Sequence, residues 1–400
     1  MKGQLKALLA TVLILALCTF SLAGCAKGDG GAAGSGTGDS QAKDPYIVGA
    51  VLSLTGSYAG LGAPEQNAIE MEVARINEAG GIKGHPLKVI YEDDGTDPAK
   101  AVAATARLID QENVIAIIGA TGTGQSMGMR TEVDRAALPQ VSVAGGTVIT
   151  SDFDPLVFQT PWSNSLVVPY TMAYLKKQGI TKIAIVTDTG GFGADGQAVL
   201  KAQAPKAGIT ITTAQTFNPG DTDMTSQLTK VKGTDSQAVV MWTAGKEAAI
   251  VAKNMLQLGM KVPLYGSHGN ARTEFVEGAG AAAEGFHFAA GKILVPESYG
   301  EGTPAYEVAT DFVKRYTAAY GKAPDTFAGH AYDAVNLIAS AMGRLDEGFT
   351  SEELRAEIEK TSGFVGIGGT FTFSATDHNG LSAGDLVMYR VENGNWIVEK

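Results

Sequence analysis

The sequence predicts an α/β protein with two similar lobes, each built on a central parallel sheet with helices on both faces. From Pro45 onward, short apolar runs alternate with longer amphipathic stretches, which is the pattern of strands and helices in a parallel sheet. The same alternation restarts after Trp162. The chain has 400 residues, and this length favours two domains over a single core.

The first series of elements begins directly after Pro45. We expect strands at 46–52, 87–91, 114–118 and 140–143, with a helix at 62–78 and another between the last two strands. A further helix runs from Pro98 to about Gln111. Its start is marked by Asp97-Pro98, because aspartate is a favoured helix cap and proline a favoured first helical residue.

The second series follows Trp162 and ends in a different kind of segment. We expect strands at 182–187, 209–216, 238–242 and 262–265, and helices at 166–178 and from about Gly193. Helices should follow at 305–320, 326–342 and 351–360, and strands at 369–373, 386–391 and 396–398. The last two strands should form a hairpin across Asn393-Gly394, since Asn-Gly is favoured in two-residue turns.

The N-terminus predicts export. Lys2 and Lys6 precede an apolar run at 7–20 and small residues, so 1–24 has the features of a secretory signal peptide. The apolar run is shorter than the roughly 20 residues of a spanning helix. Leu22-Ala-Gly-Cys25 resembles the bacterial lipobox, whose cysteine is acylated, although an ordinary signal with a chance cysteine is the alternative. The Gly- and Ser-rich segment within 25–44 then serves as a flexible tether.

These features place the protein outside the cytoplasm, anchored by lipid on Cys25 to the cell membrane and facing the periplasm or the cell exterior. Only Cys18 and Cys25 are cysteines, so the body contains no disulfide and no cysteine metal site. The net charge is −11, and no basic cluster appears, which argues against nucleic acid and anionic membrane surfaces as partners.

Enzymatic motifs are missing from the sequence. There is no Gly-x-Ser-x-Gly turn and no cysteine nucleophile in the body, and the five histidines lack metal-ligand spacing. Asp93-Asp94 follows a predicted strand and is interpreted as a solvated turn. We therefore predict no catalytic residue, no cofactor and no metal.

Three glycine-rich loops follow predicted strands and form the candidate binding site. The first, 119–124, contains Thr121 and Thr123 before a helix, so its backbone N–H groups and the helix terminus suit a carboxylate. A dinucleotide turn is the rival interpretation. However, the loop follows the third strand, and no acidic residue closes a strand about 20 residues later. A tight turn without function is the remaining alternative.

The other two loops and several aromatic residues complete the candidate site. The second loop offers Ala144, Gly145, Gly146 and Thr147, and the third, 266–270, offers His268, for which a surface position is the alternative. The aromatic candidates for the walls are Tyr58, Trp162, Phe192, Trp242 and Phe327. Trp242 ends a buried strand and fits the core as well as the pocket. Asn164 is interpreted as a helix cap, with a polar contact as the alternative.

The order of short motifs resembles a known family. The matching stretches are Ser53-Leu-Thr-Gly-Ser-Tyr-Ala-Gly60, Ile76-Asn-Glu-Ala-Gly-Gly-Ile-Lys-Gly84, Tyr91-Glu-Asp-Asp94, Asp97-Pro98, Phe192-Gly-Ala-Asp-Gly196 and Phe371-Thr-Phe373. Over 45–400 the chain resembles the type I periplasmic binding proteins of ABC importers, in the branch of the leucine/isoleucine/valine-binding protein. This implies two Rossmann-like lobes joined by a three-segment hinge. Lobe 1 would comprise 45–163 and 292–378, and lobe 2 would comprise 164–291 and 379–400, with crossings near Ser163, Gly291 and Asp377.

The resemblance also implies roles for residues. Loops matching Thr123 and 144–147 grip a ligand carboxylate, Tyr58 and Phe192 cover the ligand from opposite lobes, and Phe327 lies near it. In amino-acid-binding relatives an acidic residue stands where His268 falls and holds the ammonium group. A neutral imidazole accepts a hydrogen bond from a hydroxyl or amide, whereas a protonated one repels ammonium. His268 therefore favours an aromatic or other organic acid over a free amino acid.

The expected function is that of a monomeric substrate-binding lipoprotein, which captures a small carboxylate-bearing molecule by closure of two lobes and delivers it to an ABC permease. A sensor of the same fold, passing its closed state to a signalling partner, is the first alternative. An extracytoplasmic hydrolase or other enzyme is the second.

Overall fold

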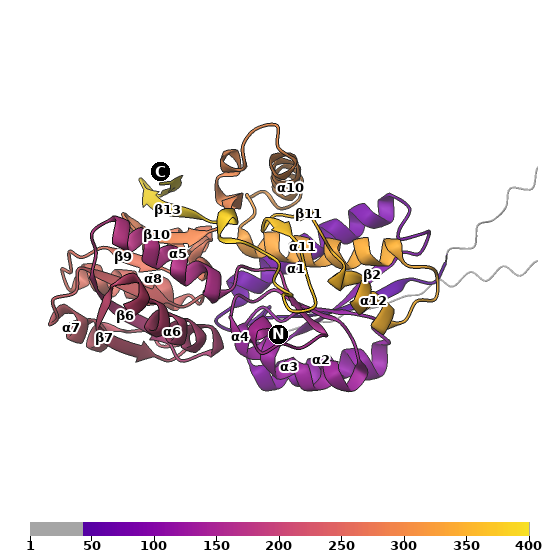
Figure 1. Ribbon diagram of the computed structural model, residues 1–400, viewed down its shortest axis with the longest axis horizontal. Helices are drawn as coiled ribbons and strands as arrows, with labels where there is room; N and C mark the ends of the chain where they lie inside the picture. Colours follow the sequence, from indigo (N-terminus) through magenta and orange to yellow (C-terminus); the bar gives the residue numbers. More distant parts are fainter. Residues whose placement is uncertain (1–42, 400) are drawn as a thin grey trace, which may run out of the picture. The chain divides into compact units, whose positions relative to one another are not determined.

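The computed structural model describes residues 43–399, which contain two large β-sheets with helices on both faces of each and a small two-stranded sheet (Figure 1). The predicted signal at 1–24 and the lipidation of Cys25 lie outside the described residues. We call the part built on the five-stranded sheet the first lobe, and the part built on the seven-stranded sheet the second lobe.

The sheet of the first lobe is entirely parallel, in the order β2-β1-β3-β4-β5. Its strands are β1 (Tyr46–Leu52), β2 (Leu87–Asp93), β3 (Ile117–Gly119), β4 (Gln140–Ser142) and β5 (Val157–Gln159). The predicted strands β1 to β4 are confirmed, with β3 beginning later than expected. Strand β5 was not predicted.

Side chains of the first sheet alternate between two helical layers. Val48, Ala50 and Leu52 face one hydrophobic cluster, and Val51 faces the other. The first face is covered by α1 (Ala59–Glu78), α10 (Pro304–Tyr320), α11 (Thr326–Arg344) and α12 (Ser351–Glu359). The opposite face is covered by α2 (Pro98–Glu112) and α3 (Thr123–Ala136), as Figure 1 shows. Asp97 caps α2 as predicted, since its side chain accepts from the N–H groups of Ala99 and Lys100.

The sheet of the second lobe has the order β14-β13-β10-β9-β8-β6-β7, with parallel strands β6 to β10 and an antiparallel edge. Its strands are β6 (Lys182–Asp188), β7 (Thr210–Phe217), β8 (Ala238–Trp242), β9 (Leu264–Gly266), β10 (His287–Ala290), β13 (Val387–Glu392) and β14 (Asn395–Val398). Helices α5 (Asn164–Lys177) and α6 (Gly191–Gln203) pack on one face. The other face packs against α7 (Thr225–Lys232), α8 (Glu247–Gln257) and α9 (Thr273–Ala279).

The C-terminal hairpin agrees with its sequence signal. Glu392 pairs with Asn395, so Asn393 and Gly394 form the two-residue turn, with φ angles of 52° and 74°. Both residues therefore adopt the left-handed conformation that this turn requires, which is why Asn-Gly is favoured there. The short elements α4 (Val148–Ser151), β11 (Phe364–Val365) and β12 (Thr370–Phe371) complete the regular structure outside the 3-10 turns. The lobe boundaries inferred from the resemblance stay a prediction.

Candidate functional site

A cavity with about 360 Å³ of empty space lies between the two lobes. It is bordered by loops that follow the carboxyl ends of β3, β4, β8 and β9, where parallel sheets commonly bind ligands. The lining residues are Tyr58, Leu61, Thr121, Gly122, Thr123, Val143, Ala144, Gly145, Pro161, Phe192, Ala244, His268, Gly269, Phe327 and His330. Eight of the twelve residues predicted for the site are therefore brought together here.

The first lobe presents the N-terminus of α3 to this cavity. Gly122 caps the helix and Thr123 begins it, so the first N–H groups have no partner within the helix. A Cβ at residue 122 would lie 2.1 Å from Oε1 of Gln125 and 3.0 Å from Cε2 of Tyr58, so these side chains pack closely against the backbone at this position. The hydroxyl of Thr123 is buried and has no hydrogen-bond partner among the described residues. This end of α3 can therefore donate several hydrogen bonds to an anion.

A buried carboxyl group stands behind Thr121. The Thr121 hydroxyl oxygen lies 2.5 Å from Oε2 of Glu65 and accepts a bond of 2.9 Å from the backbone N–H of Ser53. Glu65 is fully buried, and burial raises the pKa of its carboxyl well above the usual value. Glu65 thus fixes the orientation of the Thr121 side chain at the wall of the cavity.

The loop after β4 turns its carbonyl groups away from the cavity. The side-chain amide of Gln159 donates to the carbonyl oxygens of Ala144 and Gly146, at 2.7 and 2.9 Å. The backbone N–H groups of Gly145 and Gly146 bond to no acceptor in the described residues. Ala144 and Gly145 line the cavity, whereas Gly146 does not, and a Cβ on Gly146 would fall 2.3 Å from Cγ2 of Thr123. The loop therefore supplies free donors close to those of α3.

His268 enters the cavity from the second lobe, directly after β9. The ring is only 5% exposed, so the alternative of a surface position is wrong. Neither ring nitrogen has a hydrogen-bond partner among the described residues. Burial lowers the pKa of His268 to about 3, which leaves the imidazole neutral. A Cβ on Gly145 would lie 2.3 Å from Nε2 of His268, so the two lobes meet at this point.

His330 is a lining residue that the sequence reasoning missed. It lies on α11 three residues after Phe327, on the same helix face, and it is 3% exposed. Burial, and then the charge of His268, lower the pKa of His330 to about 3. Its ring meets Phe327 and Trp162 edge to face, with centroids 6.0 and 5.1 Å apart. The helical spacing from Phe327 was the signal that could have identified it.

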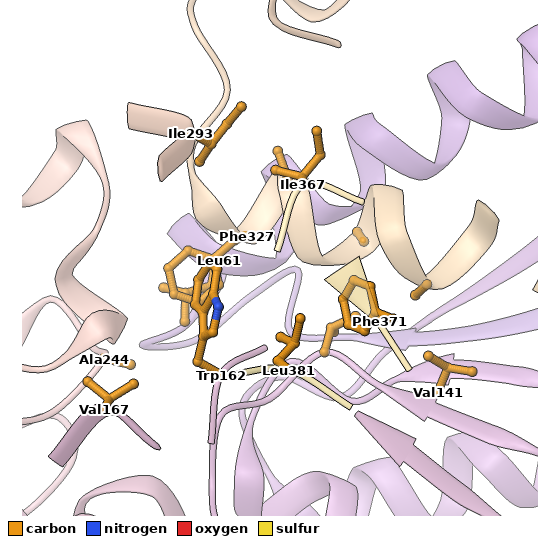
Figure 2. Close-up of a cluster of buried hydrophobic side chains, with 14 of the residues drawn as sticks. Leu61, Val141, Trp162, Val167, Ala244, Ile293, Phe327, Ile367, Phe371 and Leu381 are labelled. Atoms are coloured by element: carbon orange, nitrogen blue, oxygen red, sulfur yellow. The ribbon is translucent and has the colours of Figure 1, made fainter. Parts of the chain in front are cut away.

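Four predicted residues lie behind the cavity wall. Figure 2 shows Trp162 inside the hydrophobic cluster that also contains Leu61 and Phe327. Trp242 is fully buried and packs against α6, where a Cβ on Gly196 would approach Cδ1 of Trp242 to 1.9 Å. Gly146 and Thr147 complete this group outside the lining.

Two interpretations from the sequence are wrong. Asn164 is no cap: its Nδ2 donates to Asp195 at 2.6 Å, and its Oδ1 accepts from Nε1 of Trp242 at 2.8 Å. Asp94 is fully buried rather than solvated, because its carboxylate accepts from Oγ of Ser53 at 2.6 Å and from the N–H of Thr96 at 2.8 Å. Both side chains are occupied by partners distant in the sequence.

No lining residue of the cavity, within the described chain, is Asp, Glu, Lys or Arg. Arg272 stands close behind the wall, where its Nη2 donates to the carbonyl oxygen of Ala244 at 2.9 Å. It is almost completely buried, and burial lowers the pKa of its guanidinium. The cavity thus offers neutral donors and acceptors, with a cation behind it and no carboxylate facing a ligand.

We expect acid to destabilise the fold through the buried histidines. The unfolded imidazole takes up a proton near pH 6.5, whereas folded His268 does so only near pH 3, so protonation favours the unfolded state within this window. Relative to a His268→Gln variant, the wild type should lose about 1 kcal/mol of unfolding free energy between pH 6.5 and 5.5. Urea denaturation of both proteins measures this difference, and an unchanged difference would contradict it.

The fold and the cavity define a two-lobed protein that encloses a small solute. The chain belongs to the periplasmic binding protein family, whose model matches residues 45–395. It is 25% identical over 352 residues to Leu/Ile/Val-binding protein homolog 3 of Brucella melitensis, covering 88% of this chain and 92% of that protein. It is 26% identical over 329 residues to the leucine-, isoleucine-, valine-, threonine-, and alanine-binding protein of Pseudomonas aeruginosa, covering 80% and 85%.

Solved structures give the same assignment. The branched-chain amino acid transporter substrate binding protein LivJ of Streptococcus pneumoniae, in complex with isoleucine, has a TM-score of 0.78 and 27% identity, with 89% of this chain and 100% of that chain covered. An extracellular ligand-binding receptor of Rhodopseudomonas palustris has a TM-score of 0.83 and 25% identity, covering 89% and 99%. This chain is therefore a solute-binding protein with the type I fold. None of its helices within residues 43–399 has the length and apolarity needed to cross a membrane.

Proposed function

We propose that this protein is the substrate-binding lipoprotein of an ABC importer of the branched-chain amino acid type, and that its solute is a small carboxylic acid without an α-ammonium group. Membership of the family supports the transport role, as does the similarity to LivJ, which is named a transporter substrate-binding protein. Lipid on Cys25 would then keep a monomeric receptor beside its membrane permease.

The main support for the proposed ligand class is that no carboxylate is found among the described residues that line the cavity. Relatives named for leucine, isoleucine and valine bind solutes with both a carboxylate and an ammonium group. An ammonium group enclosed here would lose its hydration without gaining a charged partner, which is costly. His268 offers only a neutral imidazole in its place. These features favour an organic acid over an amino acid.

The donors available for the carboxylate of the solute belong mainly to the first lobe. Free N–H groups of Gly145, Gly146 and the start of α3, together with the Thr123 hydroxyl, supply uncharged hydrogen bonds. The buried cation of Arg272, which bonds to Ala244 on the second lobe, adds a favourable potential to the cavity. Phe192 and Phe327 provide apolar walls from the two lobes, which suits an aromatic or branched aliphatic body.

A thermal-shift screen of the mature protein tests the proposal. Benzoate, 3-phenylpropanoate and 4-methylpentanoate should raise the melting temperature in a saturable way, because a ligand at 100 times its dissociation constant stabilises by about 2.7 kcal/mol. The acid should be recovered unchanged after incubation. Stabilisation by leucine or valine, with none by the acids, would overturn the ligand class, and conversion of the bound acid would overturn the binding role.

A further inference from the structure

One carboxylate links the two lobes outside the cavity. Asp195 lies on α6 of the second lobe, one helical turn after the lining residue Phe192. Its Oδ2 accepts a hydrogen bond of 2.8 Å from the backbone N–H of Thr147, which belongs to the loop after β4 in the first lobe. The same oxygen accepts a bond of 2.6 Å from Nδ2 of Asn164. Asp195 itself is absent from the cavity lining.

Asn164, which bonds to Asp195, also bonds to one further residue of each lobe. Its Oδ1 accepts from Nε1 of the buried Trp242 at the end of β8, at 2.8 Å, so its amide group is held in one orientation. Its backbone N–H donates to the carbonyl oxygen of Gly145 at 3.0 Å. The Asp195 carboxylate is therefore directed at the N–H of Thr147 by a partner that is itself fixed to the core of the second lobe.

We propose that Asp195 is an affinity-setting residue that stabilises the closed arrangement of the lobes without touching the solute. The bond from Thr147 exists only when the loop after β4 meets α6, so its free energy belongs to the closed state alone. A ligand that binds the closed state gains by whatever stabilises that state. The inference rests on the proposed function to the extent that solute capture occurs by closure.

A residue that stabilises the closed lobes affects solute affinity differently from a residue that touches the solute. Loss of a hydrogen bond to a charged group changes an equilibrium constant by about tenfold or more. If the lost bond lowers only the stability of the closed state, every solute should bind more weakly by the same factor, mainly because it is released faster. A residue that touches the solute would instead change the ratio between two unlike solutes.

The test compares the wild type with Asp195→Ala, Asp195→Asn and a matched control, Asp235→Asn. Asp235 is an exposed carboxylate of the second lobe whose ion pair with Lys182 lies at the surface. Calorimetry with 3-phenylpropanoate and 4-methylpentanoate should show about tenfold weaker binding of both acids to Asp195→Ala, a smaller common loss in Asp195→Asn, and less than twofold change in the control. Without ligand, the melting temperature of Asp195→Ala should fall only slightly, through loss of the Asn164 bond within the second lobe.

Unequal losses for the two acids, unchanged affinities, or a melting temperature so low that ligand-free Asp195→Ala is partly unfolded during the titration would each overturn this role of Asp195. If neither acid binds the wild type, the proposed ligand class is wrong, and the role of Asp195 is judged with whichever of leucine and valine stabilises the wild type. Asp195→Ala should then bind that solute about tenfold more weakly than the wild type does. Equal affinities would overturn the role of Asp195.

Discussion

Replacing Gly191 by alanine should weaken solute binding by about 100-fold, a change of about 2.7 kcal/mol, without destabilising either lobe. Gly191 is the first residue of α6 in the second lobe. A Cβ at this position would lie 2.6 Å from the backbone nitrogen and 2.8 Å from the Cα of Gly124, which belongs to α3 in the first lobe. Backbone atoms cannot move aside as a flexible side chain could, so the methyl group would hold the closed lobes apart.

The control for this variant is on the other side of the same contact. A Cβ on Gly124 would lie 3.5 Å from Cγ of Pro98 and 3.8 Å from the nitrogen of Gly191, which are ordinary contact distances. Gly124→Ala should therefore bind within a few-fold of the wild type. Calorimetry with 3-phenylpropanoate and the ligand-free melting temperatures measure both variants. Equal affinities of Gly191→Ala and the wild type would mean that the solute is held without this lobe contact.

Replacing His268 by aspartate should reverse the preference of the cavity. The variant would place a carboxylate where the neutral imidazole now lies, among lining residues that include no charge. Binding of 3-phenylpropanoate should fall by about 100-fold, because two carboxylates would share one enclosed space. Phenylalanine should bind better than to the wild type, since its ammonium group would gain a charged partner.

His268→Asn separates charge from shape in this experiment. Asparagine is similar in size to aspartate and offers a carbonyl acceptor without a charge, so it should retain the preference for the acid over phenylalanine. Titration of both ligands into the three proteins measures the preference. If His268→Asp still binds 3-phenylpropanoate more tightly than phenylalanine, residue 268 does not determine the ligand class.

The alternation of apolar and amphipathic segments predicted the fold because it reflects local rules. Strand β1, the Asp97 cap and the Asn393-Gly394 turn each depend on a few consecutive residues, and each is found where the sequence places it. Strands β5 and β10 were not predicted, and their length is not the reason, since β3, β4 and β9 are as short or shorter and were predicted.

The misjudged side chains depend on partners far away in the sequence. Ser53 lies 41 residues from Asp94, and Trp242 lies 78 residues from Asn164, so neither contact could be inferred from local pattern. The helical spacing of His330 from Phe327 was a usable signal, but spacing alone does not show whether a histidine lines a cavity or lies in the core. The three glycine-rich loops were recognised because loops after neighbouring parallel strands meet at one edge of a sheet.

The central claim is that the cavity selects a carboxylate and has no partner for an ammonium group. Calorimetric titration of the mature protein with 3-phenylpropanoate and with L-phenylalanine tests it most directly, because the two solutes differ only in the α-ammonium group. We expect 3-phenylpropanoate to bind at least about tenfold more tightly, since the enclosed ammonium would lose its hydration without a carboxylate to replace it. Tighter binding of phenylalanine would contradict the account.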